Sequence, residues 1–265
     1  KNGYIVFQCK NNNEDKILKI YNNICSLIGR NQIRDATRRT SNNSSKGDIK
    51  QNAVDPDEVH RPHSETSFSP ARPAVVSFVC LDIVKDASLN GLTTLIDGFQ
   101  LWKDLNIKTK NSLLSGEIDY RLSVDTPLMK KLPRGIRPWY LEYNGVKNVE
   151  LDGENNKINF DYKTNFVTEH PLNRSLSIAN HSFIDIRTEP QIINRLVNLS
   201  LDNSKTLSLI REDIHNCLNK NISTFQWQKG LILILDNFRY MHGRLPYNLN
   251  LKRKLFISQF RNFNL

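Results

Sequence analysis

The chain has 265 residues, of which 38% are hydrophobic and 24% are charged. This composition can bury a substantial core and excludes a wholly disordered chain, and no apolar stretch approaches the roughly 18 residues of a membrane-spanning helix. Lys and Arg number 37 against 27 Asp and Glu, so the formal net charge is +10. A basic chain favours anionic partners, among them nucleic acid, an acidic metabolite and an acidic carrier protein.

The four cysteines, Cys9, Cys25, Cys80 and Cys217, are scattered along the chain without Cys-x-x-Cys spacing. Thiols placed in this way predict neither a zinc site nor a scaffold held together by disulfides. They are typical of a reducing compartment, so we expect a cytoplasmic protein.

The N-terminal part predicts a strand, a helix and a long polar loop. Residues 3–9 are β-branched and aromatic, which favours a strand, and residues 13–28 place apolar side chains at helical spacing. The chain then becomes polar and rich in Asn, Arg and Ser. We expect a mobile active-site loop over 41–59, because this segment runs directly into a cluster of His, Ser and Glu residues.

Strand patterns dominate much of the remaining chain. Residues 73–84, 227–237 and 254–263 are apolar and β-branched, and residues 115–185 combine short strand-like runs with Pro and Gly turns. Neither GxGxxG nor P-loop spacing occurs anywhere in the sequence, so a nucleotide-binding α/β fold has no support.

Helices are predicted over 98–114 and, most strongly, over 190–218, where apolar residues recur at helical spacing. The combined pattern predicts a mostly β protein with inserted helices (α+β). We expect one domain over 1–265, with a helical and strand insert at about 99–220.

Residues His63, Ser64 and Glu65 form a His-x-Glu segment. In an extended chain, alternation would place His63 and Glu65 on one face and Ser64 on the other. A neutral imidazole beside a carboxylate supplies two of the three ligands of a 2-His-1-carboxylate site for Fe(II). The alternative interpretation is a surface histidine that lies near a glutamate by chance.

Three segments further along the chain stand out, and one of them, the segment that contains His242, supplies a candidate for the third ligand. Thr93 lies in the segment 90–98, and His242 follows shortly after an apolar run that ends in Asn237. Arg253 stands 11 residues beyond His242, at the start of another apolar strand. Asn237 either ends its own strand or supports the metal site, and both interpretations remain open.

From residue 60 to the C-terminus these segments resemble the taurine-dioxygenase-like and clavaminate-synthase-like family of Fe(II)/2-oxoglutarate-dependent oxygenases. The segment 63–65 matches the family's His-x-Asp/Glu motif, and the segment around His242 matches the strand that bears the distal histidine. The resemblance implies a double-stranded β-helix (jelly roll) in which His63, Glu65 and His242 bind Fe(II).

The resemblance also implies a site for the cosubstrate 2-oxoglutarate, formed by Thr93 and Arg253, with Thr94 and Arg261 as alternatives. Three protein ligands leave three positions on the iron, two for 2-oxoglutarate and one for O₂. The far carboxylate of 2-oxoglutarate needs a planar, permanently charged partner, which suits an arginine better than a lysine.

The implied reaction is hydroxylation, desaturation or cyclisation of a small molecule, with release of succinate and CO₂. An amino acid or an amino-acid-derived intermediate is the expected substrate. Glu65 fills the ligand position that halogenating relatives leave open, so halogenation is not expected.

Two other functions are open to a chain with these motifs. One is an oxygenase that acts on a carrier-tethered or macromolecular substrate, and the other is a non-catalytic jelly-roll binding protein. The complete set of predicted ligands argues against the second. We expect no membrane partner, and the sequence contains no aromatic and basic stacking platform for nucleic acid.

Overall fold

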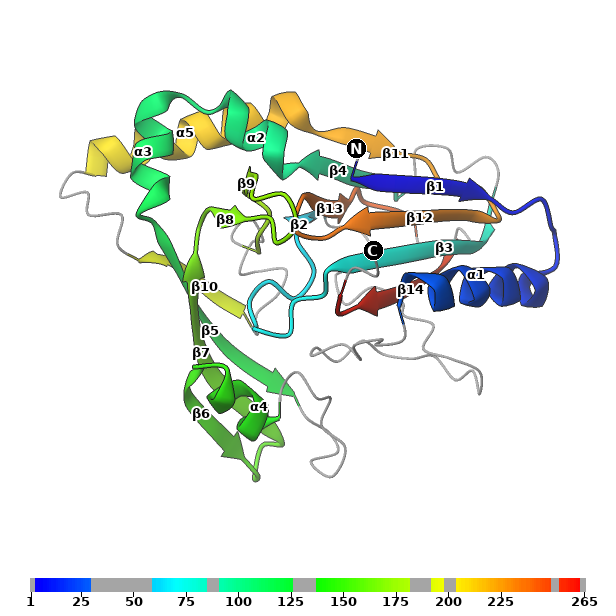
Figure 1. Cartoon of the computed structure of the whole chain (residues 1–265), viewed down its shortest axis with the longest axis horizontal. Coiled ribbons are helices and arrows are strands. Elements are labelled where there is room, and N and C mark those ends of the chain that lie inside the picture. The colour runs from blue at the N-terminus through cyan, green and yellow to red at the C-terminus, as the bar shows by residue number, and fades with distance from the viewer. Residues whose placement is uncertain are drawn as a thin grey trace.

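Two four-stranded antiparallel sheets face each other in the computed structural model, which describes residues 3–29, 59–84, 91–125, 137–181, 192–197, 204–248 and 253–262 (Figure 1). The first sheet has the order β1 (Tyr4–Gln8), β12 (Leu231–Asp236), β3 (Val75–Ile83) and β14 (Arg253–Phe260). The second has the order β11 (Ser223–Phe225), β4 (Thr93–Asp97), β13 (Tyr240–Arg244) and β2 (His60–His63).

The two sheets pack through a shared apolar cluster. Its buried members come from strands of both sheets and from the segment between β11 and β12; they include Phe78, Leu95, Trp227, Leu233 and Ile257. Because side chains alternate along a strand, β3 contributes Val76, Phe78 and Cys80 to this cluster, and β12 contributes Leu233 and Leu235. The inward faces of β13, β4 and β14 are therefore the places where functional side chains can meet.

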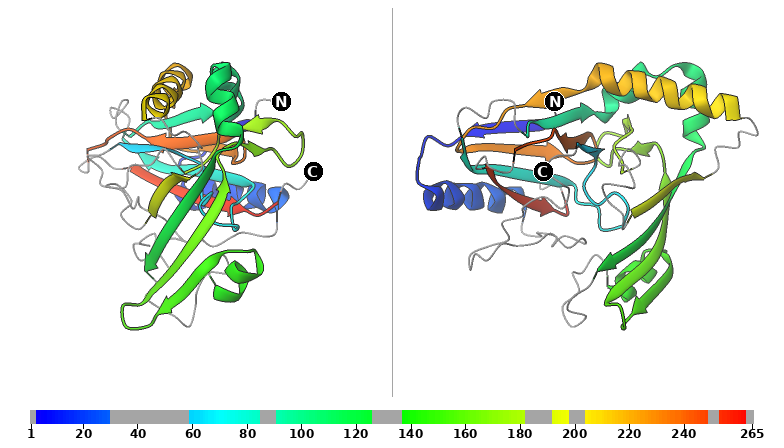
Figure 2. Two further views of the ribbon diagram at one scale, coloured as in Figure 1. Left: turned by 90° about the vertical axis from the view of Figure 1, so that its left-hand side faces the viewer. Right: turned by 180° about the vertical axis from the view of Figure 1, so that it is seen from behind.

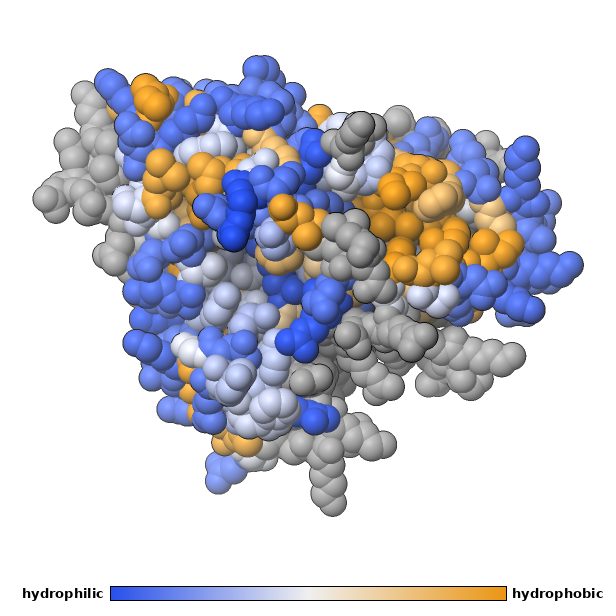
Figure 3. All heavy atoms as spheres, viewed as in Figure 1, coloured by the Kyte–Doolittle hydropathy of each residue, from blue (hydrophilic) through white to orange (hydrophobic). Residues whose placement is uncertain are grey.

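The opposite face of the first sheet is covered by α1 (Glu14–Ile28). Asn13 caps this helix, since its side-chain oxygen accepts from the Lys16 amide at 3.1 Å. Ile17, Tyr21 and Cys25 form its buried face. The edge strand β1 lies outside this cover and exposes its apolar side chains, and Figure 3 shows a hydrophobic area there.

A third sheet, with the order β10-β5-β7-β6, lies in the sequence between β4 and β11. Figure 2 shows that β5, β7 and β6 extend away from the two facing sheets. The elements between β4 and β11 are α2 (Gly98–Asp104), α3 (Ile107–Leu114), β5 (Glu117–Asp125), α4 (Pro138–Tyr143), β6 (Lys147–Asp152), β7 (Lys157–Asn165), β8 (Thr168–Glu169), β9 (Leu176–Ser177), β10 (Ile192–Val197) and α5 (Ser204–Asn221).

The helix predicted over 190–218 is wrong in its first part. Residues 192–197 form strand β10, which pairs antiparallel with β5 from Ile192 opposite Leu122 to Val197 opposite Glu117. Short runs of Ile, Leu and Val are compatible with a strand as well as with a helix. Here the pairing with the edge of the sheet at β5 favours the strand. The helix itself is α5.

The helix predicted over 98–114 is interrupted. Leu105 is extended, and Asn106 starts α3 by accepting the Thr109 amide on its side chain at 2.8 Å. The predictions of strand at 3–9 and 73–84 are confirmed by β1 and β3. The active-site loop predicted over 41–59 lies outside the described residues, except for Val59. Within the described residues, no helix is both long and apolar enough to cross a membrane.

Candidate metal centre

Three buried donor side chains converge where β2 and β13 lie side by side: His63, Glu65 and His242. His63 and His242 are opposite each other in the antiparallel pair. The Glu65 Oε2 atom lies 3.7 Å from the Nε2 of His63 and 3.4 Å from the Nε2 of His242. The three ligand atoms lie within 4.8 Å of one another, so a single ion can contact all of them.

The path of the chain differs from the extended segment that alternation predicted. β2 ends at His63, and Glu65 stands in the turn that follows, in which Thr66 adopts a left-handed conformation (φ 53°). Ser64 points away from the centre as expected, because its hydroxyl donates to the Asn237 carbonyl at 2.6 Å. The turn therefore brings the carboxylate to the histidines without strand geometry.

A hydrogen bond of the His63 ring determines which of its nitrogens carries a proton. Its Nδ1 lies 2.9 Å from the carbonyl oxygen of Arg61. A carbonyl only accepts, so Nδ1 carries a proton, and in the neutral ring the lone pair is then on Nε2, which faces Glu65. A neutral imidazole with its outer nitrogen held in this way is the form that binds a metal ion.

Asn237 supports the centre, which decides the role that its sequence left open. Its Oδ1 accepts from the Glu65 amide at 2.8 Å and its Nδ2 donates to the Glu65 carbonyl at 3.0 Å. Nδ2 also donates to the carbonyl of Pro73 at 2.8 Å. A fully buried side chain thus holds both main-chain groups of the acidic residue.

Gln259 is a second supporting residue, and sequence reasoning did not find it. Its Nε2 donates to the Glu65 Oε1 at 3.0 Å, and both side chains are buried. The available signal was a glutamine inside an otherwise apolar strand, β14. Burial of an amide is costly unless it is hydrogen-bonded, so a polar residue in such a strand indicates a specific partner.

Thr93 and Thr94 point to opposite sides of β4. Thr93 is opposite Arg244 and Leu95 is opposite His242, so Thr93 shares the inward face of the sheet with the distal histidine. Its hydroxyl oxygen accepts from the Trp227 Nε1 at 2.8 Å. Thr94 is opposite Gly243 and lies on the other face.

Arg253 is a partly buried cation on the inward face of β14, and its Nε atom is fully enclosed. Burial, together with the nearby charge of Arg244, lowers its pKa to about 10. Its Cζ lies 5.6 Å from the Tyr247 ring centroid, and the Cζ of Arg244 lies 4.6 Å from the same ring. Two guanidinium groups enclosed in this way favour a bound anion between or beside them.

Gly91 lies beside this cation, two residues before β4. It has φ +65°, and a Cβ atom there would lie 3.0 Å from the Arg253 Nε and from the Tyr247 Cβ. A larger residue would be strained and would crowd the guanidinium. The close approach places Arg253 beside the start of the strand that carries Thr93.

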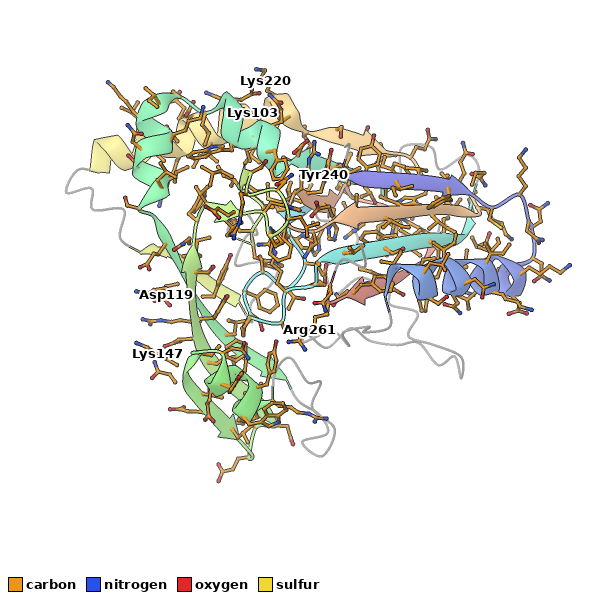
Figure 4. The ribbon with its side chains drawn as sticks, in the orientation of Figure 1. Lys103, Asp119, Lys147, Lys220, Tyr240 and Arg261 are labelled. Atoms are coloured by element: carbon orange, nitrogen blue, oxygen red, sulfur yellow. The ribbon has the colours of Figure 1, made fainter. Side chains whose placement is uncertain are left out.

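Arg261, the alternative to Arg253, is exposed, and its Cζ lies 5.9 Å from the ring of Tyr140 in α4 (Figure 4). Arg261 therefore follows the C-terminal end of β14, whereas Arg253 stands at the N-terminal end of that strand. Two other histidines are buried: His170 is hydrogen-bonded to Asp236 at 2.8 Å, and the Nδ1 of His181 lies 3.0 Å from the Ser64 carbonyl oxygen.

Facing antiparallel sheets with a buried 2-His-1-carboxylate centre define a class of proteins, the non-haem iron oxygenases. Within this class, the model of the taurine catabolism dioxygenase TauD, TfdA family matches residues 3–257. The chain therefore belongs to the TauD/TfdA family, whose members are 2-oxoglutarate-dependent non-haem iron dioxygenases. Fe(II) and 2-oxoglutarate are the cofactor and cosubstrate of this family.

Solved structures resemble the chain at low sequence identity. A Burkholderia xenovorans protein assigned as an alpha-ketoglutarate-dependent taurine dioxygenase is 12% identical, with a TM-score of 0.50 over 75% of this chain and 58% of that chain. AAD-2, crystallised with Mn(II) and N-oxalylglycine, is 17% identical, with a TM-score of 0.48 over 75% of this chain and 67% of that one. No curated protein matches the chain.

Proposed function

We propose that this protein is an Fe(II)/2-oxoglutarate-dependent dioxygenase whose iron is held by His63, Glu65 and His242. The observation that carries the proposal is the convergence of three buried donor atoms within 4.8 Å. The fixed tautomer of His63 supports it, because the nitrogen that faces the other two donors holds the lone pair. Two neutral imidazoles and one carboxylate fit Fe(II), leaving half of its charge uncompensated and three positions open.

Arg253 and Thr93 are proposed to hold 2-oxoglutarate through its far carboxylate. The buried guanidinium of Arg253 gains an anionic partner, which offsets the cost of its burial. Trp227 can only donate, so the Thr93 oxygen accepts from it and the Thr93 proton is available for a carboxylate oxygen. Arg244, stacked on the same tyrosine, adds positive potential.

When bound, the iron supplies the activation of O₂, coupled to the oxidative decarboxylation of 2-oxoglutarate to succinate and CO₂. The chain contributes positioning. Asn237 holds the main chain of Glu65, and the apolar cluster between the two sheets excludes water from the centre. We propose that the two facing sheets form a double-stranded β-helix and that 1–265 acts as one oxygenase domain, with 41–59 as its active-site loop.

The substrate is proposed to be a small molecule, an amino acid or an amino-acid-derived intermediate, that is hydroxylated, desaturated or cyclised. Membership of the TauD/TfdA family supports a small-molecule substrate. Glu65 occupies the third ligand position, which supports oxygenation rather than halogenation.

Anaerobic titration of the protein with Fe(II) and 2-oxoglutarate tests the proposal. We expect a weak visible charge-transfer band that needs both components, and succinate formation in air that rises with the correct member of a panel of amino acids and their derivatives. Folded protein that gives neither the band nor succinate would refute the proposal and favour a non-catalytic binding protein.

A further inference from the structure

The carboxylate of Glu65 has two oxygens with different surroundings. Oε2 faces the Nε2 atoms of His63 and His242 at 3.7 and 3.4 Å. Oε1 instead accepts the Gln259 Nε2 at 3.0 Å. Only the nitrogen of the Gln259 amide can donate to a carboxylate, so the orientation of this amide is fixed.

Gln259 reaches this position from β14, where it is opposite Val76 in β3. Arg253, Leu255, Ile257 and Gln259 alternate along the inward face of that strand, and Ile257 lies in the cluster between the sheets. Gln259 is 3% exposed and Glu65 is 2% exposed, so bulk water cannot replace this hydrogen bond. The strand that carries the proposed cosubstrate arginine thus also carries a partner for the acidic ligand.

We propose that Gln259 is a positioning residue that keeps Glu65 a one-oxygen ligand of the iron. This inference rests on the proposed function. By occupying Oε1, the amide leaves Oε2 as the oxygen that a bound metal would meet beside the two histidines, so that its remaining positions would stay available to 2-oxoglutarate and O₂. Because the amide is neutral, it orients the carboxylate without cancelling the negative charge that binds the metal. An arginine or lysine at the same place would weaken that charge.

The Gln259 Oε1 supports the assignment. It is buried and has no hydrogen-bond partner among the described residues. Since leaving a buried acceptor unpaired costs free energy, the amide is not placed here for stability of the protein alone. The hydrogen bond to Glu65 explains why a glutamine stands at this position.

Binding of Co(II) to the full-length, metal-free protein tests the inference without any turnover. Gln259→Met keeps the length of the side chain and removes its N–H donor. We expect the dissociation constant for Co(II) to rise about 10- to 100-fold. We also expect the visible Co(II) spectrum to change, because Glu65 becomes free to bind through both oxygens. Ser258→Ala, on the opposite face of the same strand, is the matched control and should leave both unchanged.

Gln259→Asn is the second variant, because a shorter amide cannot reach Oε1 and should show the same weakening if Gln259→Met does not fold. Co(II) affinity and spectrum that stay at wild-type values in the folded variant would overturn the inference while leaving the proposed function intact. Wild-type protein that binds Co(II) no more tightly than His63→Ala would instead refute the proposed function itself.

Discussion

The side chain of Asn237 is hydrogen-bonded to both main-chain groups of Glu65, accepting from its N–H at 2.8 Å and donating to its C=O at 3.0 Å. The two residues are 172 positions apart in the sequence. The turn after β12 therefore fixes the backbone of the acidic ligand, which itself lies in a turn and has no strand ladder to hold it. A small amide thus substitutes for regular secondary structure at the centre.

Replacement of Asn237 should lower the stability of the protein. Asn237→Ala removes two hydrogen bonds to the buried main chain of Glu65, so we expect a loss of about 2–4 kcal/mol in the free energy of unfolding. Asn237→Asp should cost at least as much, because it places an acceptor against the carbonyls of Glu65 and Pro73. Urea denaturation of the two metal-free variants measures their free energies of unfolding. Values close to wild type would contradict the role of Asn237 in holding the main chain of Glu65.

Removal of one metal ligand should abolish activity and spare the fold. His63→Ala is expected to lose tight Co(II) binding and Fe(II)-dependent succinate formation, because two donors cannot hold the ion in this geometry. The matched control is His215→Ala, which removes an exposed histidine on α5 and should bind metal normally. Circular dichroism checks the fold, and a folded His63→Ala protein with wild-type metal affinity would exclude this residue as a ligand.

Much of the centre could be predicted from the sequence because its residues lie in short local patterns. The His-x-Glu segment, the histidine after an apolar strand and the arginine 11 residues later are each readable in one stretch of chain. What brings His63 and His242 together is the pairing of β2 with β13, which joins segments far apart in sequence. Local patterns indicate the donor residues, whereas only the resemblance to a family indicated that His63 and His242 lie together.

The remaining features could not be predicted, because they depend on partners from distant segments. A glutamine in β14 has no local sign that it will face Glu65, 194 positions away. The same limit explains the error at β10, where only pairing with β5 decides that Ile192 and its neighbours form a strand. Periodicity reports which face of an element is apolar, not what that face meets.

Thr93 and Thr94 offer a matched pair of substitutions for the cosubstrate site. Thr93→Val removes the hydroxyl that faces inward, and we expect the KM for 2-oxoglutarate to rise about 10-fold or more, since a hydrogen bond to a charged group contributes about 1.5–3 kcal/mol. Thr94→Val removes a buried hydroxyl without a hydrogen-bond partner among the described residues and should change the KM little. Steady-state succinate assays measure both KM values. A larger rise in Thr94→Val than in Thr93→Val would assign the cosubstrate contact to Thr94.

Replacement of Arg253 should raise the stability of the protein and weaken cosubstrate binding, because its partly buried charge lies beside the charge of Arg244 and is compensated by a bound anion. Its pKa is lowered to about 10 by burial and by Arg244, which means that the charged form is disfavoured in the folded protein. Arg253→Met is therefore expected to raise the free energy of unfolding of the cosubstrate-free protein by about 1–3 kcal/mol. It should also remove the stabilisation by 2-oxoglutarate, about 2.7 kcal/mol at a hundred times the dissociation constant.

Thermal denaturation with and without 2-oxoglutarate, in the presence of Co(II), measures both effects of Arg253→Met. Arg261→Met is the matched control, because this exposed arginine lies beside Tyr140 at the far end of the same strand. We expect it to keep the full shift in melting temperature on addition of 2-oxoglutarate. If Arg261→Met loses that shift while Arg253→Met retains it, the cosubstrate binds at the other end of β14. If neither variant loses it, the far carboxylate is held by residues other than these two arginines.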